Sequence, residues 1–151
     1  ARVIALAMSH APVTLIDAYA GAGATAIALA ERGVRVTAIE LDAASARWVA
    51  AHLPSGSRSL IARVEDALDE ALPADVVIVN PPRAGVDERV TSTLQAATAP
   101  RAIVYVSCNP ATLARDVQRL ARYRVASLTS FDMFPQTAHV ETVCELVPEV
   151  A

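Results

Sequence analysis

Cys108 is a candidate nucleophile, because the thiolate of a cysteine is strongly nucleophilic and forms near neutral pH more readily than the alkoxide of a serine or threonine. It follows an apolar run, Ala102 to Ser107, and precedes a segment of helical periodicity that begins near Ala111. A thiol close to a helix N-terminus ionises more readily, because the helix dipole favours the negative charge. Taken alone, a single cysteine is more often a small buried apolar residue, so both interpretations stay open here. The other cysteine, Cys144, lies inside an apolar segment and is interpreted as a core residue.

A glycine turn and a downstream acid predict a site for a nucleoside cofactor. The stretch Asp17–Gly23 (DAYAGAG) separates an apolar run from a helical pattern, and its glycines let the backbone approach a ligand closely. Glu40 ends the next apolar run, where its carboxylate can accept hydrogen bonds from both hydroxyls of a ribose. The pair does not separate NAD from S-adenosylmethionine, since a dinucleotide site also has an acid about 20 residues on. The third glycine of the dinucleotide pattern is replaced by Ala26, and a tight turn without a ligand is the alternative.

Two further polar stretches follow later apolar runs. Asp66, in the pair Glu65-Asp66, can meet the amino group of an adenine or simply cap a helix. The loop Asn80–Gly85 (NPPRAG) contains two prolines, which stiffen it and leave carbonyl groups without competing N–H groups. A stiff loop beside a cofactor is suited to holding a flat base, and a plain strand terminator is the alternative.

The segment Phe131 to Glu141 (FDMFPQTAHVE) joins the last two apolar runs and contains an imidazole and two carboxylates. His139 can act as a ligand or a base, although a lone histidine in a loop is more often only solvated. Glu141 opens the last run, where it can be a catalytic base or a charge at the end of a strand.

Apolar segments alternate with amphipathic segments along the chain, which is typical of an α/β domain. Strands are predicted over residues 13–18, 34–40, 59–64, 74–79, 102–107, 124–131 and 140–147. Helices are predicted over residues 24–32, 42–53, 67–72, 87–97 and 111–122. This order predicts a doubly wound, Rossmann-like sheet that is mostly parallel. The last two strands are too close in sequence for a helical crossover, so they should pair antiparallel. Ligands bind at the carboxyl ends of strands in such sheets, which is where the candidates lie.

The chain resembles the RNA 5-methyluridine methyltransferases, which modify tRNA or 23S ribosomal RNA. The resemblance is carried by DAYAGAG, NPPRAG, YVSCNPATLARD and DMFPQTAHVET, which occur in order between Asp17 and Thr142. The last two are long and specific. The resemblance implies a class I methyltransferase fold, S-adenosylmethionine as cofactor and RNA as substrate, and it favours catalysis by Cys108 over a core position.

The resemblance also implies roles for individual residues. Cys108 is expected to be the nucleophile and Glu141 the general base. The family's cofactor-contacting positions fall on Tyr19, Gly21, Gly23, Glu40, Asp66 and Asn80. Contacts to the substrate are expected from Pro81, Arg83 and Asn109. No metal site is expected.

The sequence departs from the family pattern at two positions and in its extent. Asn80 stands where the family usually has Asp, and Ala24 stands where it often has Asn. Asn80 keeps hydrogen-bonding capacity but loses charge. The family's N-terminal RNA-binding domain, the iron–sulfur cysteines of some members and an upstream glutamine-bearing cofactor segment are absent from these 151 residues. We therefore expect residues 1–151 to form one methyltransferase domain of a longer protein.

The implied reaction is addition of the Cys108 thiolate to C6 of a uracil, which raises the electron density at C5 for attack on a methyl group. Glu141 then removes the C5 proton, and the thiolate leaves by elimination. The alternative enzyme is an amino-group methyltransferase, because Asn80-Pro81-Pro82 resembles the motif that holds an exocyclic nitrogen, although Arg83 replaces its usual aromatic residue. A module that binds cofactor or RNA without turnover, and an NAD oxidoreductase, are further alternatives.

Composition limits the partners. All 13 basic residues are arginine and the formal net charge is −3, which argues against a strong electrostatic grip on nucleic acid by this segment alone. Much of the RNA binding is therefore expected from other parts of the protein. The two cysteines are too few for a disulfide framework and are not at metal-ligand spacing, so we expect a reduced, cytoplasmic protein. The sequence has no long uncharged apolar run and no signal-peptide pattern, so we expect no membrane span.

Overall fold

A computed structural model describes residues 1–96, 98–133, 136 and 140–150. Within these ranges the chain forms one seven-stranded sheet with helices on both faces. The elements are α1 (Arg2–Ser9), β1 (Thr14–Ala18), α2 (Ala24–Ala30), β2 (Arg35–Glu40), α3 (Ala43–His52), β3 (Arg58–Ile61), α4 (Val64–Ala71), β4 (Val76–Val79), α5 (Glu88–Leu94), β5 (Ala102–Ser107), α6 (Pro110–Arg119), β6 (Tyr123–Phe131) and β7 (Glu141–Pro148).

The strand order β3-β2-β1-β4-β5-β7-β6 confirms the predicted doubly wound sheet. Strands β1 to β5 pair in parallel, whereas β7 lies between β5 and β6 and is antiparallel to both. The antiparallel pairing of the last two strands is confirmed as well. This arrangement, with one reversed strand near an edge, is the architecture expected of a class I methyltransferase.

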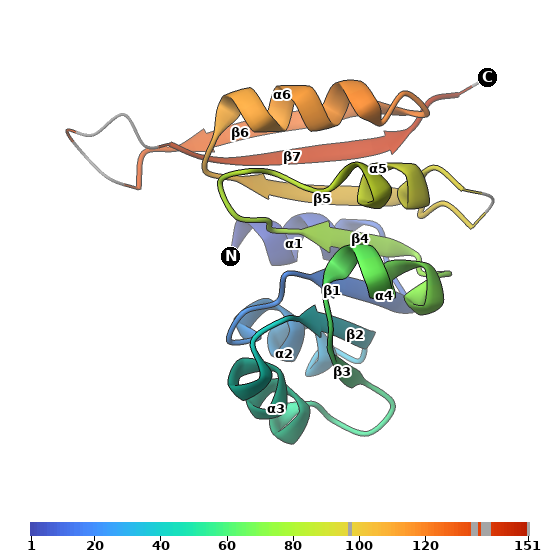
Figure 1. The fold of residues 1–151 in the computed structure, drawn as a ribbon. Helices are drawn as coiled ribbons and strands as arrows, with labels where there is room; N and C mark the ends of the chain where they lie inside the picture. The colour runs from blue at the N-terminus through green and yellow to red at the C-terminus, as the bar shows by residue number, and fades with distance from the viewer. Residues whose placement is uncertain (97, 134–135, 137–139, 151) are drawn as a thin grey trace.

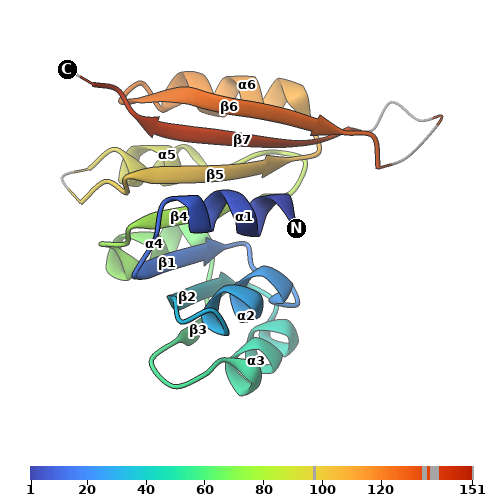
Figure 2. The same cartoon turned by 180° about the vertical axis from the view of Figure 1, so that it is seen from behind.

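Apolar side chains on both sides of the strands form two hydrophobic layers. Ile16 of β1 packs with residues of α4, α5 and α6 on one face, and its neighbour Leu15 packs with residues of α1, α2 and α3 on the other. Figures 1 and 2 show these two helical layers from opposite sides. Because both faces are covered, the central strands are continuous apolar runs, and β4 (VVIV) is buried along its whole length.

The chain changes direction across the sheet at β1, which pairs with β2 on one side and with β4 on the other. The carboxyl ends of β1 and β4 therefore diverge into loops on opposite faces, which leaves a crevice between them. The glycine turn follows β1 and the NPPRAG loop follows β4 (Figure 1). The topology thus brings two of the predicted motifs to one crevice.

One predicted element boundary was wrong, and one helix was not predicted. The third strand was expected to extend to Val64, but β3 ends at Ile61 and Val64 is the first residue of α4. Val64 is buried as part of the helix that covers the sheet, so its apolar character does not reflect a strand. Helix α1 was not predicted. It packs through Leu6 and Ala7, and its eight residues are too few to give a clear helical period in the sequence.

In the described part of the chain, no helix is long and apolar enough to cross a membrane. The same residues contain no cluster of three histidine, cysteine or acidic side chains able to hold a metal ion.

Candidate active site

The glycine turn is tied to the acid at the end of β2. The backbone N–H of Gly21 donates a 2.8 Å hydrogen bond to Oε2 of Glu40, and the N–H of Asp42 donates a 2.8 Å bond to Oε1. Asp42 in turn caps α3 by accepting a hydrogen bond from Ser45 N–H. The predicted pairing of Gly21 with Glu40 in one site is therefore present, and the carboxylate is held in a fixed orientation.

The absence of a side chain has a different consequence at each of the two glycines in this turn. Gly21 and Gly23 both adopt a positive φ, of 56° and 79°. A Cβ on Gly23 would lie 2.4 Å from Cγ2 of the buried Val49, so Gly23 allows α2 and α3 to pack closely. A Cβ on Gly21 would meet nothing within 4 Å, so the space above it is open to a ligand. Of the two predicted cofactor positions, only Gly21 is on the open side of the turn.

A pocket of about 460 Å³ opens beside Glu40, which is within the usual size range of small-molecule sites. Among the residues that line it are Tyr19, Glu40, Leu41, Glu65, Asn80 and Pro82. The side chain of Leu41 is 57% exposed, which makes it an apolar surface available to a flat ring. Burial raises the pKa of the Tyr19 phenol, and nearby acids including Glu65 add to the effect, so this hydroxyl stays neutral. The predicted residues Tyr19, Glu40 and Asn80 are thus brought together.

Asp66 is placed differently from the other predicted cofactor residues. It lies in the first turn of α4, where its Oδ1 accepts a 2.9 Å hydrogen bond from Nη1 of Arg89. Its neighbour Glu65 lines the pocket instead, with a side chain only 14% exposed. Glu65 takes the pocket-lining position in place of Asp66 because α4 starts earlier than predicted. Adjacent side chains of a helix point in different directions, so only one of the two faces the pocket.

Asp17 is a buried carboxylate that the sequence interpretation left without a role, although it is the first residue of DAYAGAG. It is 2% exposed, and its Oδ2 has no hydrogen-bond partner among the described residues. Burial raises its pKa to about 7, the negative charge of Glu40 adds to the rise, and the backbone N–H of Ala26 opposes it. A buried, partnerless carboxylate oxygen is costly, which is typical of a site that receives a cationic or hydrogen-bonding ligand.

The NPPRAG loop is fixed from one side by α6. Asn109 caps this helix, since its Oδ1 accepts a 3.0 Å hydrogen bond from Ala111 N–H, and its Nδ2 donates a 3.3 Å bond to the Arg83 carbonyl. Thr112 Oγ1 lies 3.1 Å from the same carbonyl. Pro81 is buried, whereas Arg83 is exposed. Of the three predicted substrate contacts, Asn109 has a clear structural function in holding the loop.

Cys108 lies between the end of β5 and the cap of α6, and it is partly exposed. The hydroxyl of Ser107 shapes this corner, because it donates to the Asn109 carbonyl and accepts from the Asn109 N–H. The second cysteine, Cys144, is fully buried in β7, as predicted, and burial raises the pKa of its thiol to about 11.

Glu141 opens β7, on the strand that runs antiparallel to β5. Ser107 pairs with Thr142 in this ladder, so the register continued by one residue would place Glu141 opposite Cys108. The predicted nucleophile and base therefore reach the same edge of the sheet from strands far apart in sequence. Residues 134–135 and 137–139 of the DMFPQTAHVET motif, which include His139, lie outside the described residues.

Comparisons with known proteins bear on the family and the fold of this chain. The family described as "tRNA (Uracil-5-)-methyltransferase" matches residues 55–147. The 23S rRNA (uracil(747)-C(5))-methyltransferase RlmC of Shewanella amazonensis is 38% identical over 149 residues, which cover 93% of this chain and 38% of that protein. The solved tRNA (uracil-54, C5)-methyltransferase of Pyrococcus abyssi, in complex with S-adenosyl-L-homocysteine, superposes with a TM-score of 0.77 at 36% identity, covering 89% of this chain and 34% of its own.

More distant structures share the fold. The N-methyltransferase NodS of Bradyrhizobium japonicum has a TM-score of 0.79 at 15% identity, with 98% of this chain and 85% of its own covered. The chain spans little more than a third of the length of RlmC from Shewanella amazonensis and about a third of the Pyrococcus abyssi enzyme. The family match extends over more than half of the chain and confirms the resemblance carried by its motifs. The chain therefore belongs to the tRNA (uracil-5-)-methyltransferase family.

Proposed function

We propose that the protein transfers a methyl group from S-adenosylmethionine to C5 of a uridine in RNA. The proposal is carried by the β5–β7 register, which brings the predicted nucleophile Cys108 and the predicted base Glu141 to one edge of the sheet. The pocket that Glu40 and Asn80 line follows the carboxyl ends of β2 and β4 at the same edge. A thiol, a carboxylate and a nucleoside-sized pocket at one edge are the parts that this chemistry needs.

The residues around the pocket fit S-adenosylmethionine. A carboxylate has about four acceptor positions, and the Gly21 and Asp42 N–H groups occupy two of those on Glu40, which leaves others for ribose hydroxyls. The partnerless Oδ2 of Asp17 suits a cationic ammonium group. Leu41 offers an apolar surface to the adenine, and Asn80 an amide for polar contacts. When bound, the cofactor supplies an electrophilic methyl group on a sulfonium centre.

In this proposal Cys108 activates the uracil ring of the target uridine. Uracil C5 is a weak nucleophile, and a bond between the Cys108 sulfur and C6 moves electron density to C5. Cys108 is partly exposed, whereas Cys144 is enclosed in the core.

Glu141 completes the cycle by removing the proton from C5. Loss of that proton returns an electron pair to the C5–C6 bond and expels the Cys108 thiolate, so the enzyme is released from the RNA. A target base in a folded RNA must leave its stack to reach such a site. Pro82 and Arg83, in the loop that α6 holds, form one side of the approach to it.

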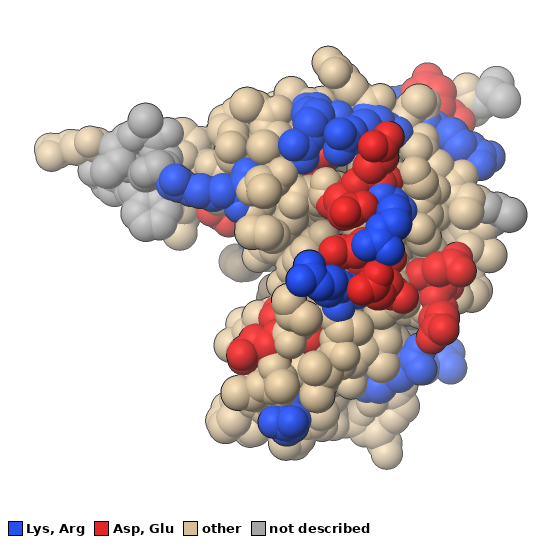
Figure 3. Space-filling model, in the orientation of Figure 1, with Lys and Arg blue, Asp and Glu red and all other residues tan. Residues whose placement is uncertain are grey.

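The RNA substrate is proposed from the family and from the uridine chemistry. We propose rRNA or tRNA as the class of substrate, because RlmC of Shewanella amazonensis acts on 23S rRNA and the Pyrococcus abyssi enzyme on tRNA. The face with α4, α5 and α6 carries interspersed arginine and acidic side chains (Figure 3). A surface of mixed charge binds a phosphate backbone weakly. We therefore propose that this chain is the catalytic domain of a longer, cytoplasmic protein, and that other parts of that protein bind most of the RNA.

A trapped covalent adduct tests the proposal. Glu141→Gln keeps the size of the side chain but removes the base, so the complete protein should methylate once and stay attached to the RNA. Incubation with S-adenosylmethionine and a uridine-containing RNA should give a slowly migrating protein–RNA band on a denaturing gel. The band should disappear with Cys108→Ala and persist with the matched control Cys144→Ala. Methylation that survives Cys108→Ala would overturn the proposal and favour the amino-group methyltransferase suggested by Asn80-Pro81-Pro82.

A further inference from the structure

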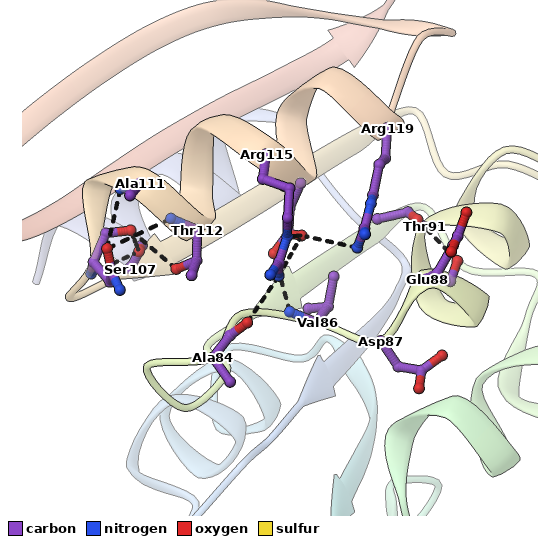
Figure 4. Close-up of polar contacts among 12 residues, drawn as sticks. Ala84, Val86, Asp87, Glu88, Thr91, Ser107, Ala111, Thr112, Arg115 and Arg119 are labelled. Atoms are coloured by element: carbon purple, nitrogen blue, oxygen red, sulfur yellow. Dashed lines mark hydrogen bonds and ion pairs between the residues drawn. The ribbon is translucent and has the colours of Figure 1, made fainter.

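Arg115 connects the helix that follows Cys108 to the loop that follows β4. Its Nη2 donates a 2.8 Å hydrogen bond to the carbonyl oxygen of Ala84, in the middle of the NPPRAG loop. The same guanidinium contacts Oδ1 of Asp116, with Nε at 3.0 Å and Nη2 at 2.9 Å. Figure 4 shows Arg115 reaching from α6 toward Ala84. The Arg115 guanidinium thus joins the Asp116 carboxylate to the Ala84 carbonyl.

Asp116 gives this contact a rigid base. Its side chain is fully buried, and its Oδ2 accepts hydrogen bonds from the Tyr105 hydroxyl at 2.6 Å and from the Val86 N–H at 3.0 Å. Tyr105 belongs to β5, two residues before Ser107. Strand β5, which ends just before Cys108, the helix α6 after it and the loop are therefore joined through the Asp116 carboxylate.

The loop lies so close to α6 that it has no room for a side chain at Gly85. A Cβ there would lie 2.4 Å from Oδ2 of Asp116 and 2.5 Å from Nη2 of Arg115. Asn80 at one end of this loop lines the cofactor pocket, and Arg83 follows it on the side of Cys108. A small displacement of the loop would consequently change the position of the target base relative to the sulfur.

We propose that Arg115 is a positioning residue for the methyl transfer, which holds the Ala84 carbonyl and so fixes the loop of residues 80–86 relative to Cys108. The inference rests on the proposed function, since it assigns the loop to the target base. Misplacement of reacting groups by about 1 Å can slow a reaction about 100-fold. Arg115 therefore acts on the rate of adduct formation more than on affinity for RNA.

Arg119 provides a matched control. It lies one helical turn after Arg115, and its Nη1 is 3.6 Å from the same Oδ1 of Asp116, so its removal also takes one positive charge from this carboxylate. The described hydrogen bonds include none from its side chain to the loop. After loss of either arginine, Asp116 keeps the other arginine, the Tyr105 hydroxyl and the Val86 N–H, so both variants should fold.

The experiment compares Arg115→Met with Arg119→Met in the complete protein that carries Glu141→Gln, so that the adduct accumulates. The maximal rate of adduct formation and the half-saturating RNA concentration are measured under single-turnover conditions, at a temperature where circular dichroism shows all variants folded. Arg115→Met should lower the maximal rate about 10-fold to 100-fold and leave the half-saturating concentration as in Arg119→Met. Arg119→Met should keep the rate of the Glu141→Gln parent.

Each other result has a distinct meaning. Equal maximal rates for the two arginine variants would overturn the assignment of Arg115, and so would a change confined to the half-saturating RNA concentration. A purely structural role would lower the thermal midpoint of Arg115→Met while the folded variant reacted at the parental rate. Absence of the adduct in the Glu141→Gln parent would instead contradict the proposed function itself.

Discussion

The backbone N–H of Gly21 donates a 2.8 Å hydrogen bond to Oε2 of Glu40, which joins the loop after β1 to the end of β2. The other carboxylate oxygen of Glu40 accepts the N–H of Asp42 at 2.8 Å. Glu40 therefore has two functions, since it orders the glycine turn and offers its remaining lone pairs to a ligand. A substitution at this position should affect both.

Glu40→Gln should weaken binding of S-adenosylmethionine or its demethylated product by about 10-fold to 100-fold, corresponding to the roughly 1.5–3 kcal/mol of a hydrogen bond to a charged group. The amide retains one acceptor oxygen, but its NH₂ group must face the N–H of either Gly21 or Asp42. Isothermal titration calorimetry measures the affinity directly. Glu31→Gln, which removes a carboxylate from the exposed end of α2, is the control and should bind like the parent protein. Equal affinities for the two variants would exclude Glu40 from the cofactor site.

Asn80→Asp should retain or raise methyltransferase activity, because it restores the acid usual in the family and a carboxylate accepts hydrogen bonds more strongly than an amide. The side chain is exposed at the end of β4 and lines the pocket, so the added charge is solvated. Asn80→Ala removes the polar group altogether and should lower activity. Methyl incorporation into RNA is measured for all three proteins. A large loss in Asn80→Asp would show that the site, which also contains Glu40 and Glu65, is adapted to the amide.

Gly85→Ala should destabilise the protein more than Gly33→Ala does. Both glycines have a positive φ, of 77° and 88°, so both substitutions carry backbone strain of about 1–2 kcal/mol. A Cβ on Gly33 has nothing within 4 Å, whereas one on Gly85 overlaps Asp116 and Arg115. The overlap should add about 1–3 kcal/mol to the loss of unfolding free energy, measured by urea denaturation. Similar losses for the two variants would mean that the loop can move away from α6 at little cost.

The sequence pattern predicted the central parallel strands β1, β4 and β5 well, because most of their residues are buried. The run VVIV in β4 is continuously apolar because helices cover both sides of the sheet, and such a short apolar run is typical of a buried parallel strand. The sequence pattern predicted α4 less well. An apolar Val64 is compatible with the end of a strand and with the start of a helix, and only its packing against the sheet decides for the helix. The consequence for the site is that Glu65, and not Asp66, lines the pocket.

Buried acidic residues near the site were harder to identify from the sequence than the exposed ones. Asp17 looks like any acid at the end of a strand, and its partnerless oxygen becomes evident only when the surrounding core is known. Asp116 left a weak signal, because it interrupts the apolar stripe between Leu113 and Leu120 on α6. An acid in such a stripe indicates a buried, paired charge, but the sequence does not say that its partners are Arg115 and a loop 30 residues earlier.

Asp17 should make the free energy of unfolding fall as the pH rises from acidic to neutral values. Burial raises its pKa from 3.8 to about 7 in the folded protein. Because the folded state then binds more protons than the unfolded state between these two values, stability is highest at the acidic end of this window and becomes level above it.

Asp17→Asn cannot titrate, so it lacks this decline. Between about pH 5 and about pH 8, the unfolding free energy of Asp17→Asn relative to the parent should rise by about 2–3 kcal/mol in the absence of cofactor. Denaturant unfolding at a series of pH values measures the difference. Asp42→Asn is the control, because the Ser45 N–H lowers the pKa of Asp42 and its titration ends below this range. Its difference from the parent should be constant across the window, and a constant difference for Asp17→Asn as well would show that Asp17 is ionised in the folded protein throughout.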